Sequence, residues 1–447
     1  MINVRSNVFN IVPTKFAARQ AKDPCQQPTT PQLAHTLPFR GNYNTSFRTT
    51  LSGQEETTKY NTLTQMLDKK EKKTLELALK SGVLLNNASN DKSTVLDNLY
   101  NIATKPRAEG LNNKTILTDT INSVTNPYTI TQKFGDIPKE YRQEVISELT
   151  GNSQNLIERK KAENQLDNLY SGCCVAASEQ FSLATKQPAE YVRMVEGISS
   201  PSKAVEKKIK LSSLSQNTGD AIWLLNAFEI PYTATNYETA TLKLAPDKNA
   251  YTRAKIQQDY RDPLERSSVD VLMQSTFMNV GSQQTYNSLN DKRAGKFSSD
   301  DSGLIDYEKT FLETIVEDKN ITSVTYQNID ENQVLQGYTA DFDTIKNQLL
   351  KTIDKGHNII IGYTVTNHKN EIVGAHEITI TDYKKDNKGQ LMFICNDTDD
   401  DVSEPVVYPA SYLIPKIHHA GIPEDIANED LKQIETWRYN LNEMNKK

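Results

Sequence analysis

The sequence predicts an α+β protein, because helical patterns come first along the chain and β-rich runs cluster late. Apolar residues recur at helical spacing between 55 and 170, and further helical patterns follow at 174–186, 188–196, 219–229 and 343–354. Runs rich in β-branched and aromatic residues then occur at 358–366, 377–383, 391–395 and 405–408. At 447 residues the chain exceeds the size of one hydrophobic core, so two structured regions are expected.

Composition divides the chain into four segments. Residues 1–54 are rich in Asn, Thr, Gln and Pro and are expected to form a disordered leader. Residues 55–151 are expected to form a helical subdomain, 152–430 the main domain, and 431–447 a C-terminal tail. Within the main domain, the polar stretch 281–303 is long enough to be a functional loop.

Charge and hydropathy exclude several classes of partner. The net charge of −6 comes without a basic patch, so neither nucleic acid nor a membrane surface is expected as a partner. The N-terminus lacks the apolar core of a secretory signal, and no run approaches the ~20 apolar residues of a membrane span. We therefore expect a soluble protein that is cytoplasmic or exported without a Sec-type signal.

Four cysteines are too few for a disulfide framework, and their spacing forms no zinc motif. The pattern suits thiol chemistry without a metal or another cofactor. Cys173 and Cys174 follow a small-residue turn and begin a helical pattern. A helix N-terminus favours the thiolate, which is the reactive form. Taken alone, such a cysteine is more often a buried core residue, so the segment leaves both readings open.

Residues 168–178 resemble the nucleophile segment of the papain-like cysteine peptidases. In that register Gly172 matches the family's glycine, Cys174 its nucleophile, and Ala176 and Ser178 the alanine and serine of the following helix. Cys173 falls on a serine. The resemblance implies that Cys174 is the catalytic residue.

The same segment departs from the family at two positions. The family's oxyanion-hole glutamine is replaced by Asn168, with Gln165 as the alternative donor, and the tryptophan after the nucleophile is replaced by Val175. The backbone N–H of Cys174 would supply the other donor to the oxyanion.

A second stretch, 217–220, is similar to the family's Gly-Cys-Asn-Gly-Gly segment, and a helical pattern follows it. In that register Thr218 and Gly219 would bind substrate, with the glycine offering its backbone for close approach. The alternative is an ordinary loop at a helix start.

The third stretch, 374–383, resembles the family's histidine segment and contains His376 at the start of a predicted strand. The next predicted strand leads to Asn396, which would orient the imidazole as the third catalytic residue. Asp397 is its rival for that role. His418 and His419 are expected in a late loop without a function, and a structural role remains the alternative for His376.

The resemblance implies a papain-like two-lobed catalytic domain, with a helical lobe and an antiparallel β lobe, over residues 152–430. The long separation of Cys174 and His376 indicates an insertion at about 240–338. The helical segment 55–151 would be an inhibitory propeptide, in which 126–135 crosses the active site, or a docking subdomain.

These features predict a cysteine peptidase that hydrolyses protein or peptide substrates through an acyl-enzyme, made as a zymogen if 55–151 is a propeptide. Two alternatives stay open. One is a Cys-His-Asp acyltransferase, transglutaminase or deamidase, which Asp397 would favour. The other is a non-catalytic papain-like binding protein.

Overall fold

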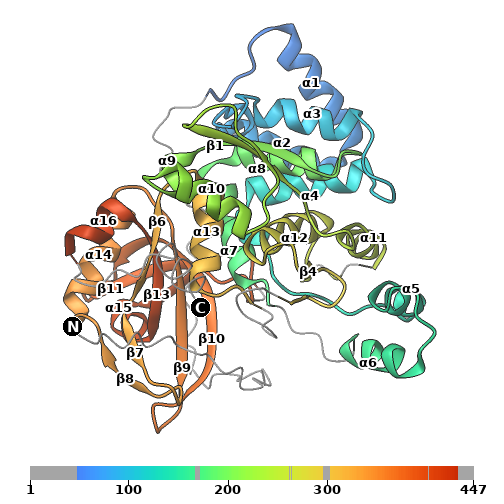
Figure 1. Ribbon diagram of the computed structural model, residues 1–447. Helices are drawn as coiled ribbons and strands as arrows, with labels where there is room; N and C mark the ends of the chain where they lie inside the picture. Colours follow the sequence, from blue (N-terminus) through green and yellow to red (C-terminus); the bar gives the residue numbers. More distant parts are fainter. Residues whose placement is uncertain are drawn as a thin grey trace.

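The computed structural model describes residues 48–166, 172–260, 262, 264–294, 303–400 and 402–430. It confirms the α+β class, with helices and antiparallel sheets. Most helices gather in one part of the molecule and the largest sheet in another (Figure 1). The leader before residue 48 and the tail from 431 lie outside the described residues.

The helical part contains thirteen α-helices among the residues described between 48 and 317. Acidic or hydroxyl side chains cap several of their N-termini, as Asp68, Thr94 and Ser267 do in capping boxes. The helices are α1 (Gly53–Met66), α2 (Lys69–Lys80), α3 (Val95–Thr104), α4 (Asn113–Thr125), α5 (Lys139–Leu149), α6 (Leu156–Leu166), α7 (Cys174–Lys186), α8 (Pro188–Ile198), α9 (Leu211–Leu214), α10 (Thr218–Ala227), α11 (Ala250–Tyr260), α12 (Ser268–Gly281) and α13 (Asp306–Glu317).

Two small sheets accompany these helices. The first has the order β1-β3-β2, with β1 (Val205–Lys210), β2 (Tyr232–Thr233) and β3 (Thr239–Leu244), and all its pairings are antiparallel. The second pairs β4 (Tyr286–Asn287) with β5 (Lys292–Arg293), so the segment 281–303 contains a short hairpin where a polar loop was expected.

The sheet part is built on six antiparallel strands in the order β12-β11-β10-β9-β13-β6. Helix α14 packs against β9 and β10 and shares a hydrophobic core with them. The elements are β6 (Ile321–Thr325), β7 (Gln327–Ile329), β8 (Leu335–Tyr338), α14 (Phe342–Asp354), β9 (Ile359–Thr366), β10 (Ile372–Lys385), β11 (Leu391–Asn396), β12 (Val406–Pro409), α15 (Ala410–Leu413), β13 (Ile417–Pro423) and α16 (Glu424–Asp430).

The segment of about 240–338, predicted as an insertion, contributes residues to the hydrophobic cores of both the helical part and the sheet part. Helix α12 is buried along its whole length and packs against α7, and α13 packs against both. Strand β6 forms one edge of the six-stranded sheet. Sequence separation alone does not say which elements lie at the centre of a fold, so the insertion at about 240–338 stays a prediction.

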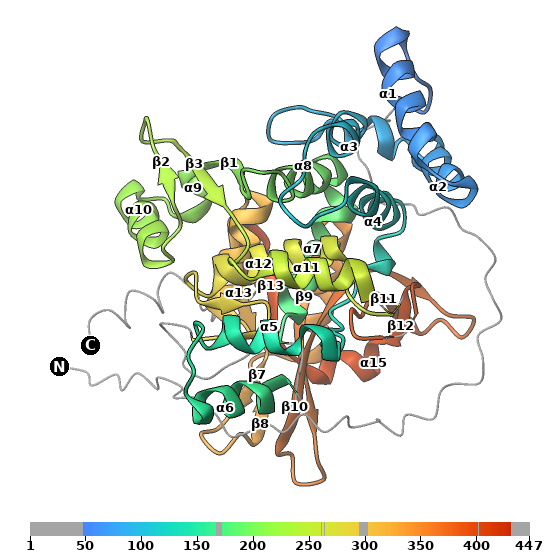
Figure 2. The same cartoon turned by 90° about the vertical axis from the view of Figure 1, so that its right-hand side faces the viewer.

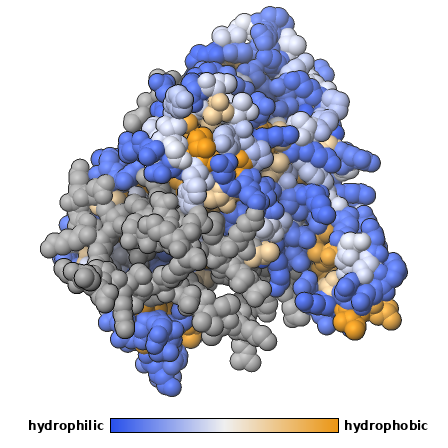
Figure 3. Space-filling model, viewed as in Figure 1, coloured by the Kyte–Doolittle hydropathy of each residue, from blue (hydrophilic) through white to orange (hydrophobic). Residues whose placement is uncertain are grey.

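The segment 55–151 is helical, and α1 to α4 share one hydrophobic core with α7, α8 and α12. Helices α5 and α6 stand apart from α1 to α4 on a smaller core (Figure 1) and lie toward the viewer in the turned view (Figure 2). Leu156 and Ile157 on α6 are each 81% exposed, and apolar surface is visible at this end of the molecule (Figure 3). Among the described helices, none combines the length and apolar character needed to cross a membrane.

Candidate active site

The turn before α7 is fixed by a hydrogen bond, and it separates two cysteines with different surroundings. The Gly172 N–H donates to the Asp291 carboxylate over 2.6 Å. Cys173 is fully buried, and its thiol donates to Gln274 Oε1 at 3.1 Å while Arg266 Nη1 donates to the sulfur at 3.3 Å. Cys173 is therefore a core residue within a polar network.

Cys174 is the first residue of α7 and partly exposed, and its side chain interacts with that of His376. The backbone N–H groups of a first helical turn have no partner within the helix, and the helix dipole places positive potential there. A helix start of this kind stabilises negative charge placed beside it. The structure thus brings together the predicted nucleophile and the predicted base, and it turns the neighbouring cysteine away.

His376 lies in the middle of β10 rather than at the start of a strand, because β10 already begins at Ile372. Its Nε2 is 2.8 Å from Asp397 Oδ1. Directly opposite on β9 stands Tyr363, whose ring meets the imidazole edge to face at 5.8 Å between centroids. Tyr363 was not predicted as part of the site, because cross-strand register cannot be deduced from local pattern. It covers one face of the imidazole.

The charges of the site favour a protonated imidazole. Burial alone would lower the pKa of His376, but the hydrogen bonds with Asp397 and Cys174 outweigh it and raise that pKa well above its ordinary value. Burial would raise the pKa of Asp397, but its hydrogen bond with His376 holds it below the ordinary value. The arrangement places the imidazole of His376 between a carboxylate and a thiol.

Asn396 does not contact His376. It is the last residue of β11, is 2% exposed and pairs with Thr379 of β10. Its Nδ2 has no hydrogen-bond partner among the described residues. Consecutive strand residues leave on opposite faces, so only one of Asn396 and Asp397 can reach the imidazole. The group beside the histidine is the aspartate.

The oxyanion-hole residues are less well placed. Asn168 lies outside the described residues. Gln165 is on α6, where its Oε1 accepts a hydrogen bond from Asn290 Nδ2 at 3.3 Å. None of the hydrogen bonds described for Gln165 involves Cys174. Of the predicted oxyanion donors the Cys174 backbone N–H remains, and the second donor is unassigned.

Thr218 and Gly219 are not brought to the cysteine either. They begin α10, which packs on α9, and Ser213 of α9 donates to Asp318 at the end of α13. The other end of α13, its N-terminus, lies near the turn before Cys174. A Cβ on Gly303, just before α13, would be 3.6 Å from the Gly172 carbonyl oxygen. A helix of 12 residues is about 18 Å long. The predicted substrate contact therefore lacks support from this placement.

The stretch 126–135, predicted to cross the active site, runs past it in the interior. Thr131 Oγ1 and the Gln132 N–H both donate to the Thr398 carbonyl oxygen at 2.9 Å. The Cys173 sulfur in turn lies 3.8 Å from the Gln132 carbonyl oxygen. Gln132 and its neighbours are buried, so the stretch links α7 to the loop that carries Asp397.

Comparison of the chain with protein-family models, with curated proteins and with solved structures found no match.

Proposed function

We propose that the protein is a cysteine peptidase in which Cys174 attacks a peptide carbonyl, His376 transfers the proton and Asp397 orients His376. One observation carries the proposal: the imidazole of His376 lies between the Asp397 carboxylate, 2.8 Å from its Nε2, and the Cys174 thiol, which stands at a helix N-terminus. The thiol lies on a helix, the imidazole on an antiparallel sheet and the carboxylate on the loop directly after a strand of that sheet, as the papain-like resemblance implies. We extend the proposal to a papain-like catalytic unit.

The orientation of the imidazole supports this assignment of roles. Its Nε2 faces Asp397, so Nδ1 is the nitrogen that faces the thiol. Asp397 fixes the tautomer and stabilises the imidazolium. Tyr363 limits rotation of the ring from one side. These contacts hold the base in a geometry suited to proton transfer.

The reaction follows from this geometry. The Cys174 thiolate adds to the carbonyl carbon, and the oxyanion that forms accepts a hydrogen bond from the Cys174 N–H. The imidazolium gives its proton to the departing amine, the C–N bond breaks, and an acyl-enzyme remains. Neutral His376 then takes a proton from water, whose oxygen attacks the thioester. Release of the carboxylic acid restores the thiolate and the imidazolium.

The aspartate as third residue favours a second candidate, an acyl transfer to an amine or the hydrolysis of a side-chain amide. The same acyl-enzyme forms in both cases, and only the acceptor or the carbonyl donor changes. A transglutaminase, deamidase or acyltransferase would therefore use the same three side chains.

We further propose that the segment 55–151 is a permanent part of the enzyme rather than a removable propeptide. Leu63, Leu99 and Ile130 lie in the same core as Val175 and Phe181 of α7. Removing the segment would expose that core to water, at about 25 cal/mol for each Å² of apolar surface. This supports a structural or docking role.

The test is to incubate the full chain with a peptide library, with and without a primary amine, and to analyse the products by mass spectrometry. The Cys174→Ala variant is the matched control. New peptide termini that depend on Cys174 support the peptidase. Amine adducts or deamidated glutamines support the second candidate. Identical products from both proteins would exclude both and favour a binding protein.

A further inference from the structure

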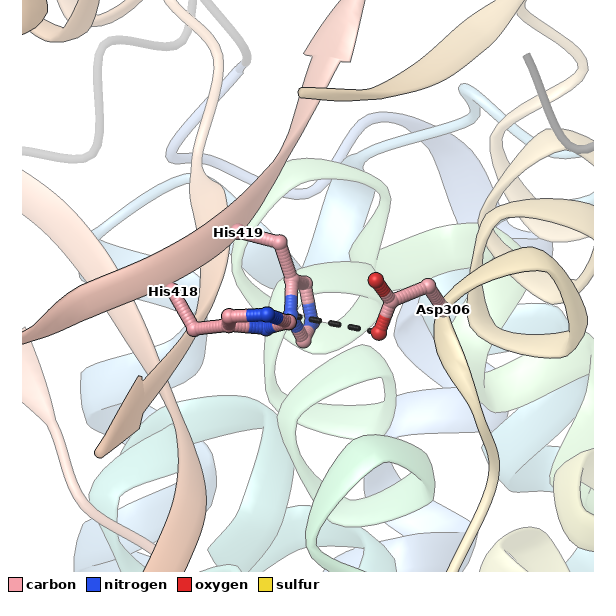
Figure 4. Close-up of side chains that lie close together, drawn as sticks. All are labelled: Asp306, His418 and His419. Atoms are coloured by element: carbon pink, nitrogen blue, oxygen red, sulfur yellow. Dashed lines mark hydrogen bonds and ion pairs between the residues drawn. The ribbon is translucent and has the colours of Figure 1, made fainter. Parts of the chain in front are cut away.

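A second polar centre lies beside the candidate active site, where β13 meets the first turn of α13. It consists of Asp306, His418 and His419, which we call the histidine cluster (Figure 4). The two histidines belong to β13, not to the loop expected from the sequence. The pairing of β13 with β9 shifts between Ile417 and His419. Such a bulge re-aims a side chain, so the two consecutive rings can meet, with their Nδ1 atoms 2.9 Å apart.

A glycine on β9 makes room for the side chain of His419. Gly362 of β9 is paired with both Glu377 and His419. A Cβ at Gly362 would lie 2.6 Å from Glu377 Oε1 and 2.7 Å from His419 Nε2, far inside van der Waals contact. The absence of a side chain at this position therefore lets the imidazole and the carboxylate approach each other across β9.

Glu377 lies on the Nε2 side of the His419 imidazole. Its Oε1 lies 3.0 Å from His419 Nε2, and its Oε2 lies 3.1 Å from Lys309 Nζ. A carboxylate on this side of the ring is the usual arrangement behind a metal-binding histidine, and it leaves Nδ1 as the nitrogen that faces the rest of the cluster. Lys309 Nζ also donates to the Ile360 carbonyl oxygen at 2.9 Å, so its charge is already engaged.

The Nδ1 atom of His419 faces two other electron-rich atoms. His418 Nδ1 is 2.9 Å away and Asp306 Oδ1 is 3.2 Å away, and all three atoms lie within 4.8 Å of one another. Lone pairs and a carboxylate that converge in this way need a cation between them, either a proton or a metal ion. Two ligands of one ion with bonds of ~2.0–2.1 Å are about 2.9–3.4 Å apart, depending on the coordination geometry.

We propose that Asp306, His418 and His419 bind one divalent transition-metal ion, with Zn²⁺ as the best match. Imidazole ligands select Zn²⁺ and its neighbours over Mg²⁺ and Ca²⁺. Three protein ligands leave a fourth position for water, and Asp306, whose side chain is 38% exposed, leaves that side open to solvent. The ion would join α13 of the helical part to β13 of the sheet part.

The test uses the full chain without an affinity tag, carrying Cys174→Ser so that the thiol cannot bind zinc together with His376. After treatment with EDTA and dialysis, the protein is titrated with ZnCl₂ by calorimetry and with CoCl₂ by visible absorption. We expect one Zn²⁺ per chain with a Kd in the micromolar range or below, and a visible band from Co²⁺. His418→Ala and Asp306→Asn should each weaken binding at least tenfold, whereas His368→Ala, in the exposed turn after β9, should not change it.

Zinc binding that survives both ligand substitutions would overturn the proposal. The absence of a cobalt band and of zinc binding in the parent protein would overturn it as well, and would leave a protonated histidine shared with the carboxylates as the explanation. The parent protein decides this second outcome, so it does not depend on whether the variants fold.

Discussion

Two histidines, one on β10 and one on β13, stand beside a carboxylate at nearly the same distance, yet their surroundings suit different chemistry. His376 Nε2 is 2.8 Å from Asp397, and His419 Nε2 is 3.0 Å from Glu377. His376 and Glu377 are consecutive residues of β10, so their side chains leave on opposite faces. The difference lies in the third group, which is a thiol at a helix start for His376 and a second imidazole for His419. The carboxylate–imidazole pair alone therefore does not identify a catalytic site.

The largest expected effect separates the two neighbouring cysteines. We expect Cys174→Ala to lower kcat/KM for peptide hydrolysis by about 10³-fold or more, because the nucleophile is removed. Cys173→Ala should keep activity within about tenfold but lower the free energy of unfolding by about 1–2 kcal/mol, because buried contacts with Gln274 and Arg266 are lost. Kinetics and urea unfolding measure the two effects. Equal loss of activity in both variants would refute the assignment of Cys174.

The next effect concerns the third residue. Asp397→Ala should lower kcat/KM by about 10²-fold or more, because the imidazole loses the group that orients it. Asn396→Ala should lower it by less than about tenfold, because Asn396 does not contact His376. Steady-state kinetics of the two purified variants decides between them. A larger loss in Asn396→Ala would return the orienting role to the asparagine.

The other histidine can be perturbed without touching the catalytic row. Gly362→Ala should lower the free energy of unfolding by about 2–3 kcal/mol, because its Cβ would collide with His419 and Glu377. Gly374→Ala is the matched control on β10, since its Cβ would find only Val365 at 3.9 Å, an ordinary contact. Urea unfolding of both variants measures the difference. Equal stability of the two would show that the close packing around His419 is not required.

The smallest effect is a shift in pH dependence. A histidine whose pKa is raised in the folded protein stays charged at neutral pH and loses its proton as pH rises through the raised pKa. The rate of Cys174 alkylation by iodoacetamide should therefore show a step in its pH profile that reports His376. Asp397→Asn removes a group that raises this pKa, so the step should move to lower pH. An unchanged profile would show that Asp397 does not govern the protonation of His376.

Local signals in the sequence predicted much of the fold. The pattern 174–186 coincides with α7, and the runs 358–366 and 391–395 match β9 and β11 to within a residue. These signals depend on spacing within one element and on a small-residue turn, which act over a few residues. For the same reason the helix start at Cys174 could be located from sequence.

Choices that depend on register or on distant packing could not be predicted. Whether Asn396 or Asp397 faces His376 is set by strand face and by the irregular pairing of β10 with β11 between Ile380 and Asp382. The approach of His418 and His419 depends on a bulge, and Asp306 reaches them from a distant segment. The role predicted for Gly219 came from resemblance in one segment, and the fold places that segment elsewhere.

The central claim is that His376 activates Cys174, and thiol labelling tests it most directly. The native full chain is treated at neutral pH with limiting iodoacetamide, and the modified cysteines are located by peptide mass mapping beside the His376→Ala variant. We predict fast labelling of Cys174, slow labelling of the buried Cys173 and Cys395, and a loss of the fast reaction at Cys174 in the variant. Labelling of Cys174 at the same rate in both proteins, or no faster than that of Cys173, would contradict the claim.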